Sequence, residues 1–177
     1  MKKSLLALLM LVVPPASAFD DPEDFRGLKW DASESEALRL FPELRKLQTA
    51  RSPSRPPGTS LYSLLNVKLG DIAVNIGFGF MNGQFAHALI SFPDKDFSAV
   101  EAAFIERYGP PTTTMEETLT TGMGVKYRNR KHRWVGEKIL IYLDQYFGKI
   151  TTGLANLTTK EYFAAFGANR DKRSQAF

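Results

Sequence analysis

The chain contains few residues whose type and spacing suit catalysis. Its two histidines, His87 and His132, fit neither an H-x-x-x-H nor an H-E-x-x-H pattern, so the sequence predicts no metal site. The chain has no cysteine, which excludes thiol catalysis and disulfide bonds. Phosphate-binding loops, the nucleophile elbow and the dinucleotide-binding glycine motif are also missing, so we expect no cofactor. A hydrolase would need acidic side chains that converge on a histidine in one cleft.

The adjacent carboxylates are poor candidates for that role. Asp20-Asp21 and Glu116-Glu117 fall in predicted loop or extended segments, where neighbouring side chains diverge and cannot share a proton. His87 is expected opposite Phe78 at the edge of the core, and His132 has no acid near it in the sequence. We therefore predict that the protein is not an enzyme, and keep a hydrolase as an alternative.

The strongest concentration of polar side chains is the basic run 126–134, KYRNRKHRW. In a strand, every second residue of this run would share one face. Such a cationic face with aromatic neighbours could hold an anionic envelope polymer or an acidic partner. The alternative is an edge strand whose charges protect it against aggregation. The candidate binding residues are Lys126, Arg128, Arg130, Lys131, Arg133 and Trp134.

The N-terminus predicts export. Lys2 and Lys3 precede an apolar segment over 5–13 that is too short to span a bilayer, and Ala16-Ser17-Ala18 follows as a cleavage site. A buried helix is the alternative. Removing residues 1–18 lowers the formal charge from +4 to +2, so overall charge indicates no particular partner. We expect a periplasmic or secreted protein with no transmembrane segment and no nucleic-acid partner.

Three helices are expected from capping patterns. Ser33 with Glu36, Ser98 with Glu101, and Thr158 with Glu161 each match a capping box. They predict a helix from Ser33, a helix over 94–109 and a short C-terminal helix over about 159–167. The proline-rich segment 48–60 is expected to be a solvated connector or a binding arm. Residues 112–121 are expected to form a ragged strand or a mobile loop.

Strands are expected over 61–69, 72–81, 84–92, 124–134, 138–146 and 149–157. Asn82-Gly83 suits a type I′ hairpin turn, which would place Phe78 opposite His87. The other face of this hairpin would then carry Gly77, Gly79, Ala86 and Ala88, either covered by a helix or open to solvent. Phe147-Gly148 is expected to be a second two-residue loop that places Leu143 opposite Thr152.

These elements predict an α+β fold in a single domain over 19–177. Each half reads as a helix followed by three strands that end in a tight hairpin. We therefore expect two α-β-β-β units, over about 25–92 and 94–157, that build antiparallel sheet with helices packed on one face. The short C-terminal helix follows the second unit.

Three segments resemble a group of small exported bacterial proteins. They are FRGLKWDASESEA over 25–37, RYGPPT over 107–112 and RWVGEKILI over 133–141. These segments look like uncharacterised periplasmic proteins with helix-plus-β-meander units, similar to BamE/SmpA and to the β-lactamase inhibitory protein. The resemblance implies a protein-binding or scaffold role and transfers no catalytic residue. We expect an exported, non-catalytic binding or adaptor protein of the bacterial cell envelope, with an envelope protein as its partner. An anionic polymer is the alternative ligand.

Overall fold

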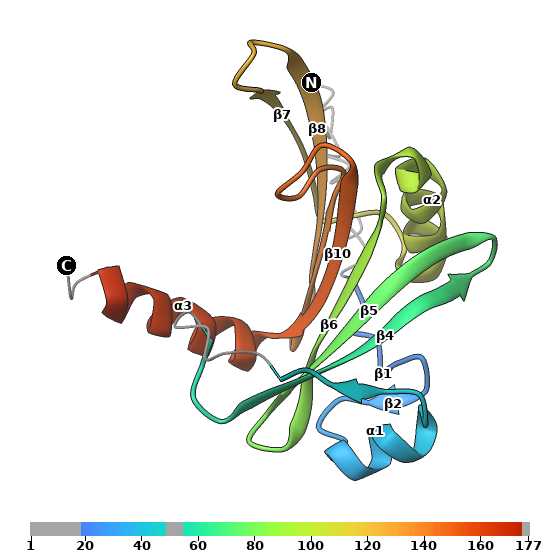
Figure 1. Ribbon diagram of the computed structural model, residues 1–177, viewed down its shortest axis with the longest axis vertical. Coiled ribbons are helices and arrows are strands. Elements are labelled where there is room, and N and C mark those ends of the chain that lie inside the picture. Colours follow the sequence, from blue (N-terminus) through green and yellow to red (C-terminus); the bar gives the residue numbers. More distant parts are fainter. Residues whose placement is uncertain (1–18, 49–54, 175–177) are drawn as a thin grey trace, which may run out of the picture.

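A computed structural model describes residues 19–48 and 55–174 (Figure 1). The predicted signal peptide over 1–18 lies outside these residues, as do positions 49–54 of the predicted loop and positions 175–177. The described part combines three α-helices with mostly antiparallel sheet, so the predicted α+β class is confirmed.

The framework is one eight-stranded antiparallel sheet with strand order β3-β4-β5-β6-β10-β9-β8-β7. A separate hairpin of β1 (Asp24–Phe25) and β2 (Leu28–Lys29) precedes it. The segment 112–121, expected as strand or loop, is strand β7. The eight strands are β3 (Arg45–Lys46), β4 (Thr59–Leu69), β5 (Ile72–Met81), β6 (Gln84–Pro93), β7 (Thr113–Thr120), β8 (Lys126–Val135), β9 (Ile139–Asp144) and β10 (Thr152–Thr159).

The helices lie on both faces of this sheet (Figure 1). Helices α1 (Glu34–Leu40) and α2 (Phe97–Tyr108) cover the face that carries the hydrophobic core. A 3₁₀ turn, η1 (Asp94–Asp96), leads into α2. Helix α3 (Lys160–Ser174) leaves the end of β10 on the side of the sheet opposite to α2 and extends outwards, past the predicted end at 167 (Figure 1). The expectation that all helices pack on one face therefore holds for α1 and α2 only.

The capping predictions have mixed outcomes. The box of Ser33 and Glu36 is confirmed at the start of α1. The box of Ser98 and Glu101 is wrong, because α2 begins at Phe97 and the Glu101 carboxylate contacts β8 instead. At α3 the hydroxyl of Thr159, the residue after the predicted cap, accepts the Tyr162 N–H at 3.2 Å.

The β5–β6 hairpin contains a bulge that the turn alone does not predict. Asn82 and Gly83 both have positive φ, as the type I′ prediction requires. After the Phe80–Phe85 pair, however, the register shifts so that His87 lies opposite Gly79 and Ala88 lies opposite Phe78. A one-residue shift moves all later side chains to the other face. The predicted Phe78–His87 pairing is therefore wrong, and His87 lies on the α3 side.

The second predicted hairpin is also corrected. The link between β9 and β10 is longer than the two residues Phe147-Gly148, and it places Leu143 opposite Ala155 rather than Thr152. Within this link the Phe147 N–H donates to the Thr152 carbonyl and the Lys149 N–H donates to the Phe147 carbonyl. Residues 147–152 therefore form a turn within the link, and the β9–β10 pairing begins beyond it, with Asp144 opposite Leu154.

The core lies between the sheet and the α1, α2 and β1–β2 layer. Its centre is a group of aromatic rings, in which the Phe25 and Phe78 centroids are 5.7 Å apart and the Phe78 and Phe85 centroids are 5.9 Å apart. Trp30 stacks on Phe85 at 4.9 Å. The segment 24–30, which includes the β1–β2 hairpin, is therefore a structural part of the core.

Replacing Gly153 by alanine should destabilise the protein by about 1–3 kcal/mol through overpacking. A Cβ at this position would lie 2.2 Å from the Phe92 ring, which is itself buried. Gly122→Ala is the matched control, because no atom lies within 4 Å of its Cβ position. Denaturant unfolding of both variants checks this expectation, and equal stability of the two variants would contradict it.

Candidate functional site

The predicted basic residues do not form one continuous surface. On β8, Arg130 and Trp134 face α2, whereas Lys131 and Arg133 face the α3 side. Trp134 is 0% exposed, and its indole N–H donates to the Gly109 carbonyl at 2.9 Å. Trp134 therefore lies in the core, where a ligand cannot reach its ring.

Four of the predicted basic residues are already ion-paired within the chain. The separations are 3.6 Å for Arg128–Glu116, 2.8 Å for Arg130–Glu101, 2.5 Å for Lys131–Glu117 and 2.5 Å for Arg133–Asp144. An anionic polymer would have to compete with these carboxylates. The geometry therefore gives less support to polymer binding than the sequence suggested, and it favours a structural role for most of these charges.

The structure brings an acid to His132 that the sequence did not indicate. Glu101 of α2 lies 2.7 Å from the Nε2 atom of His132, and the Thr114 hydroxyl lies 2.9 Å from Nδ1. Hydroxyl, imidazole and carboxylate in line are also the parts of a nucleophilic triad. Here the His132 side chain is only 5% exposed and Phe97 stacks on it at 6.2 Å, so a substrate has no access to the ring.

On the α3 side of the sheet, a hollow of about 140 Å³ is lined by uncharged and aromatic side chains and one acid. Phe147 and Phe163 border it and are 55% and 48% exposed. At its floor the Oδ1 atom of Asn156 is buried and has no hydrogen-bond partner among the described residues. We call this the aromatic groove; its residues are Tyr142, Asp144, Phe147, Leu154, Asn156 and Phe163.

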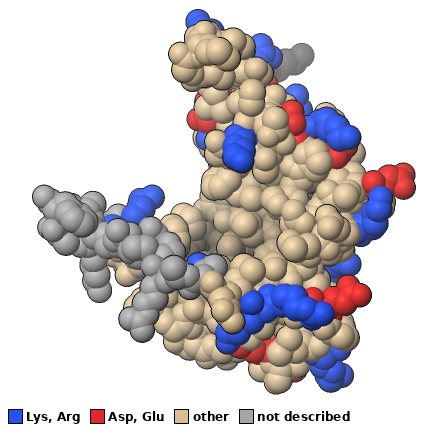
Figure 2. Space-filling model, viewed as in Figure 1, with Lys and Arg blue, Asp and Glu red and all other residues tan. Residues whose placement is uncertain are grey.

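The aromatic groove continues along the sheet. A second hollow, of about 400 Å³, shares Asp144 and Phe147 with it and extends towards β7 and β8. Figure 2 shows this side of the molecule hollowed between the β7–β8 end and the region of α3, with mostly uncharged residues in the hollow itself. The second hollow is more polar, because its lining includes Glu117, Lys131 and Lys149. The exposed rings of the aromatic groove are the part that is typical of an interaction site.

The predicted small-residue face of the β5–β6 hairpin is not formed, because the bulge places Ala88 in the core opposite Phe78 and places His87 opposite Gly79. The His87 ring lies against Gly79, where an added Cβ would be 3.0 Å from Nδ1, and Tyr162 of α3 stacks on the ring at 5.1 Å. Burial lowers the pKa of His87 from its usual 6.5 to about 4, and the neighbouring Asn156 side chain offsets part of this shift. His87 is therefore a neutral packing residue at neutral pH.

Between about pH 7 and pH 4.5, the free energy of unfolding of the wild-type protein should decrease. This decrease should be about 2–3 kcal/mol larger than the decrease in the His87→Gln variant. The folded-state pKa of His87 is below the unfolded value of 6.5, so in this window the unfolded chain binds a proton that the folded chain does not. Denaturant unfolding at both pH values measures the difference. Parallel pH profiles for wild type and variant would show that His87 is not buried in its neutral form.

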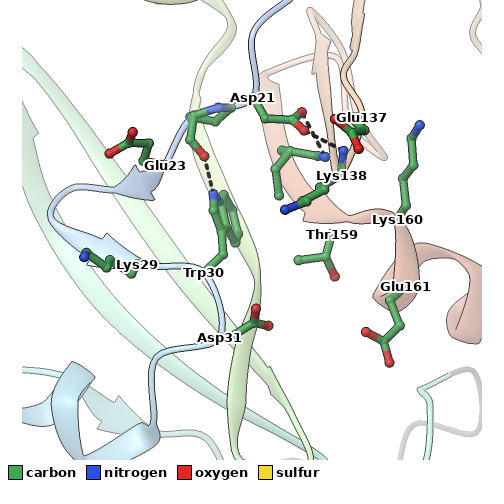
Figure 3. Close-up of a pocket in the computed structure, with 12 residues that line it drawn as sticks. Asp21, Glu23, Lys29, Trp30, Asp31, Glu137, Lys138, Thr159, Lys160 and Glu161 are labelled. Atoms are coloured by element: carbon green, nitrogen blue, oxygen red, sulfur yellow. Dashed lines mark hydrogen bonds between the residues drawn. The ribbon is translucent and has the colours of Figure 1, made fainter.

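A separate cleft, of about 740 Å³, lies where four distant parts of the chain meet (Figure 3). The Asp21 carboxylate accepts the backbone N–H groups of Lys138 and Ile139 at 2.5 and 3.1 Å, which ties the N-terminal segment to the β8–β9 turn. The Trp30 indole N–H donates to the Pro22 carbonyl at 2.7 Å. Lys160, at the start of α3, lines the far side. This open, polar hollow was not expected from the sequence.

The part of the chain that the structure describes contains neither a metal-binding cluster nor a membrane-spanning helix. Within residues 19–48 and 55–174, no group of His, Asp and Glu side chains is arranged to hold a metal ion. In the same ranges, no helix has both the length and the apolar character needed to cross a bilayer. Comparisons of the chain with protein-family models, with curated proteins and with solved structures found no match.

Proposed function

We propose that the protein is an exported, non-catalytic binding module of the bacterial cell envelope that docks a partner protein in the aromatic groove. The observation that carries this proposal is the pair of exposed rings, Phe147 and Phe163, that border the groove. A docked segment would cover both rings.

The energetics favour an apolar partner segment. Fully burying a phenylalanine side chain contributes about 1.5–3 kcal/mol, and aromatic anchors often dominate a protein interface. Arg133 and Asp144 beside the groove already neutralise each other, so the partner segment needs no net charge.

Export and the two-unit plan belong to the same proposal. We infer cleavage near Ala18 and a periplasmic or secreted location from the N-terminal pattern. Each half has a helix followed by four strands, α1-β3-β4-β5-β6 and α2-β7-β8-β9-β10, which is one strand more per half than the predicted α-β-β-β unit. The last strands of the two halves, β6 and β10, are antiparallel neighbours, which supports a plan of two similar units. The resemblance to BamE/SmpA-like and inhibitory-protein folds, which also use helix-plus-meander units, supports a protein-binding role.

A photo-crosslinking amino acid at position 163 of the tagged full-length protein tests the proposal in the native envelope. We expect one discrete protein adduct, which Phe147→Asp should abolish. Position 65 on β4 is the control, because Leu65 is 68% exposed but does not line the groove. The same adducts at positions 163 and 65, or an adduct that survives Phe147→Asp, would overturn groove docking.

A further inference from the structure

We propose that the cleft between Trp30 and the start of α3 is a saccharide-binding site. It is separate from the aromatic groove, with which it shares no lining residue. Its volume of about 740 Å³ is in the range of about 300–1,000 Å³ that is usual for ligand pockets. Figure 3 shows Trp30 and Asp31 on one side, Lys160 and Glu161 on the other, and an open space between them.

Most of the charged side chains that line the cleft have no partner among the described residues. Five carboxylates and three lysines line the cleft, and only Asp21 among them makes a hydrogen bond through its side chain to another described residue. By contrast, Arg130 and Arg133 on β8 each have a carboxylate partner. The cleft therefore presents free acceptors and free donors side by side. The seven unpaired side chains are Glu23, Lys29, Asp31, Glu137, Lys138, Lys160 and Glu161.

Two contacts fix the position of the Trp30 indole at the cleft. Stacking on Phe85 at an interplanar angle of 8° and the hydrogen bond to the Pro22 carbonyl hold the indole in place. Because Trp30 lines the cleft and is only partly buried, the exposed part of its fixed ring is a preformed apolar contact. A ligand that stacks on it loses little side-chain entropy from the protein, which favours binding.

These two features together select the ligand chemistry. Sugar hydroxyls both donate and accept, so they suit carboxylates and ammonium groups in the same site. The C–H face of a sugar ring suits an indole wall. The five carboxylates disfavour a polyanion, the three lysines disfavour a polycation, and the many charges disfavour a wholly apolar ligand. A neutral oligosaccharide meets all of these conditions.

Intrinsic fluorescence provides a direct test with the full chain. The protein has two tryptophans, and Trp134 is buried, so a change in quenching by added ligand reports Trp30. The probes are tetrasaccharides of N-acetylglucosamine and of glucose, with tetra-alanine as a peptide comparison. We expect saturable binding of at least one tetrasaccharide with a Kd of about 1 mM or tighter.

The variant Lys138→Gln with Glu161→Gln should weaken this binding at least about tenfold. Lys68→Gln with Glu106→Gln is the matched control, because it makes the same charge changes at exposed positions outside the cleft. Thermal unfolding should be the same for both double variants. Binding of tetra-alanine alone, no saturable binding of either tetrasaccharide, or wild-type affinity in the cleft variant would overturn the proposal. Phe147→Asp should leave saccharide binding intact, which separates this test from that of groove docking.

Discussion

Replacing Trp134 by alanine is expected to lower the free energy of unfolding by about 3–5 kcal/mol. The side chain is fully buried, and Phe104 of α2 and the His132 ring lie against it with centroids 6.0 Å away in each case. Truncation would leave a large cavity between α2 and the sheet. It would also leave the Gly109 carbonyl at the end of α2 without its indole donor. Equilibrium unfolding in urea measures the loss.

Trp30→Ala is the matched control for this prediction. It removes the same side chain, but Trp30 is only partly buried and borders an open cleft, so the loss should be clearly smaller. If Trp134→Ala cost no more than Trp30→Ala, the placement of Trp134 in the core would be wrong. The predicted role of Trp134 in binding would then deserve a new test.

Replacing Glu101 by glutamine should destabilise the protein by about 1.5–3 kcal/mol, the usual range for hydrogen bonds that involve a charged group. The Glu101 carboxylate accepts two contacts from Arg130, at 2.9 and 2.8 Å, and one oxygen contacts His132 at 2.7 Å. The glutamine side chain has nearly the same shape but no charge, and its NH2 group replaces one of the two acceptor oxygens of the carboxylate. The Arg130 guanidinium, which also lies over the Phe97 ring, would lose its closest carboxylate.

Glu106→Gln is the control, because Glu106 lies on the same helix and is exposed. Its effect should stay within about 0.5 kcal/mol of wild type. A double-mutant cycle with Arg130→Met would isolate the energy of the pair from the effect of each single change. Equal stability of the two glutamine variants would show that Glu101 does not hold α2 against β8.

The distinction between a structural and a catalytic role for His132 follows from the same contacts. Glu101, His132 and Thr114 form a line that sequence spacing could not reveal, because α2, β8 and β7 supply one residue each. Glu101 is 31 residues away from His132 in the sequence, so the residues next to His132 do not indicate this contact. The burial of the ring beneath Phe97, which only packing decides, favours the structural role.

Sequence patterns were reliable where neighbouring residues decide the outcome. The Ser33 capping box and the Asn82-Gly83 turn were predicted correctly, because each depends on side chains and φ angles within a few residues. The α+β class followed from the alternation of helical and strand patterns. The same patterns also predicted the basic run as a strand, which is β8.

Tertiary structure alone decided which faces these elements present. The bulge after Phe85 placed His87 beneath α3, because a one-residue shift reverses every later side chain of a strand. The longer β9–β10 link set a register that a two-residue turn does not allow, and it left Phe147 exposed beside Phe163. The cleft joins residues 21–31 to residues 137–161, so its geometry depends on long-range packing contacts, which no local pattern of residues encodes. The aromatic groove lies within residues 142–163, and its shape depends on the register of β9 and β10 and on the position of α3.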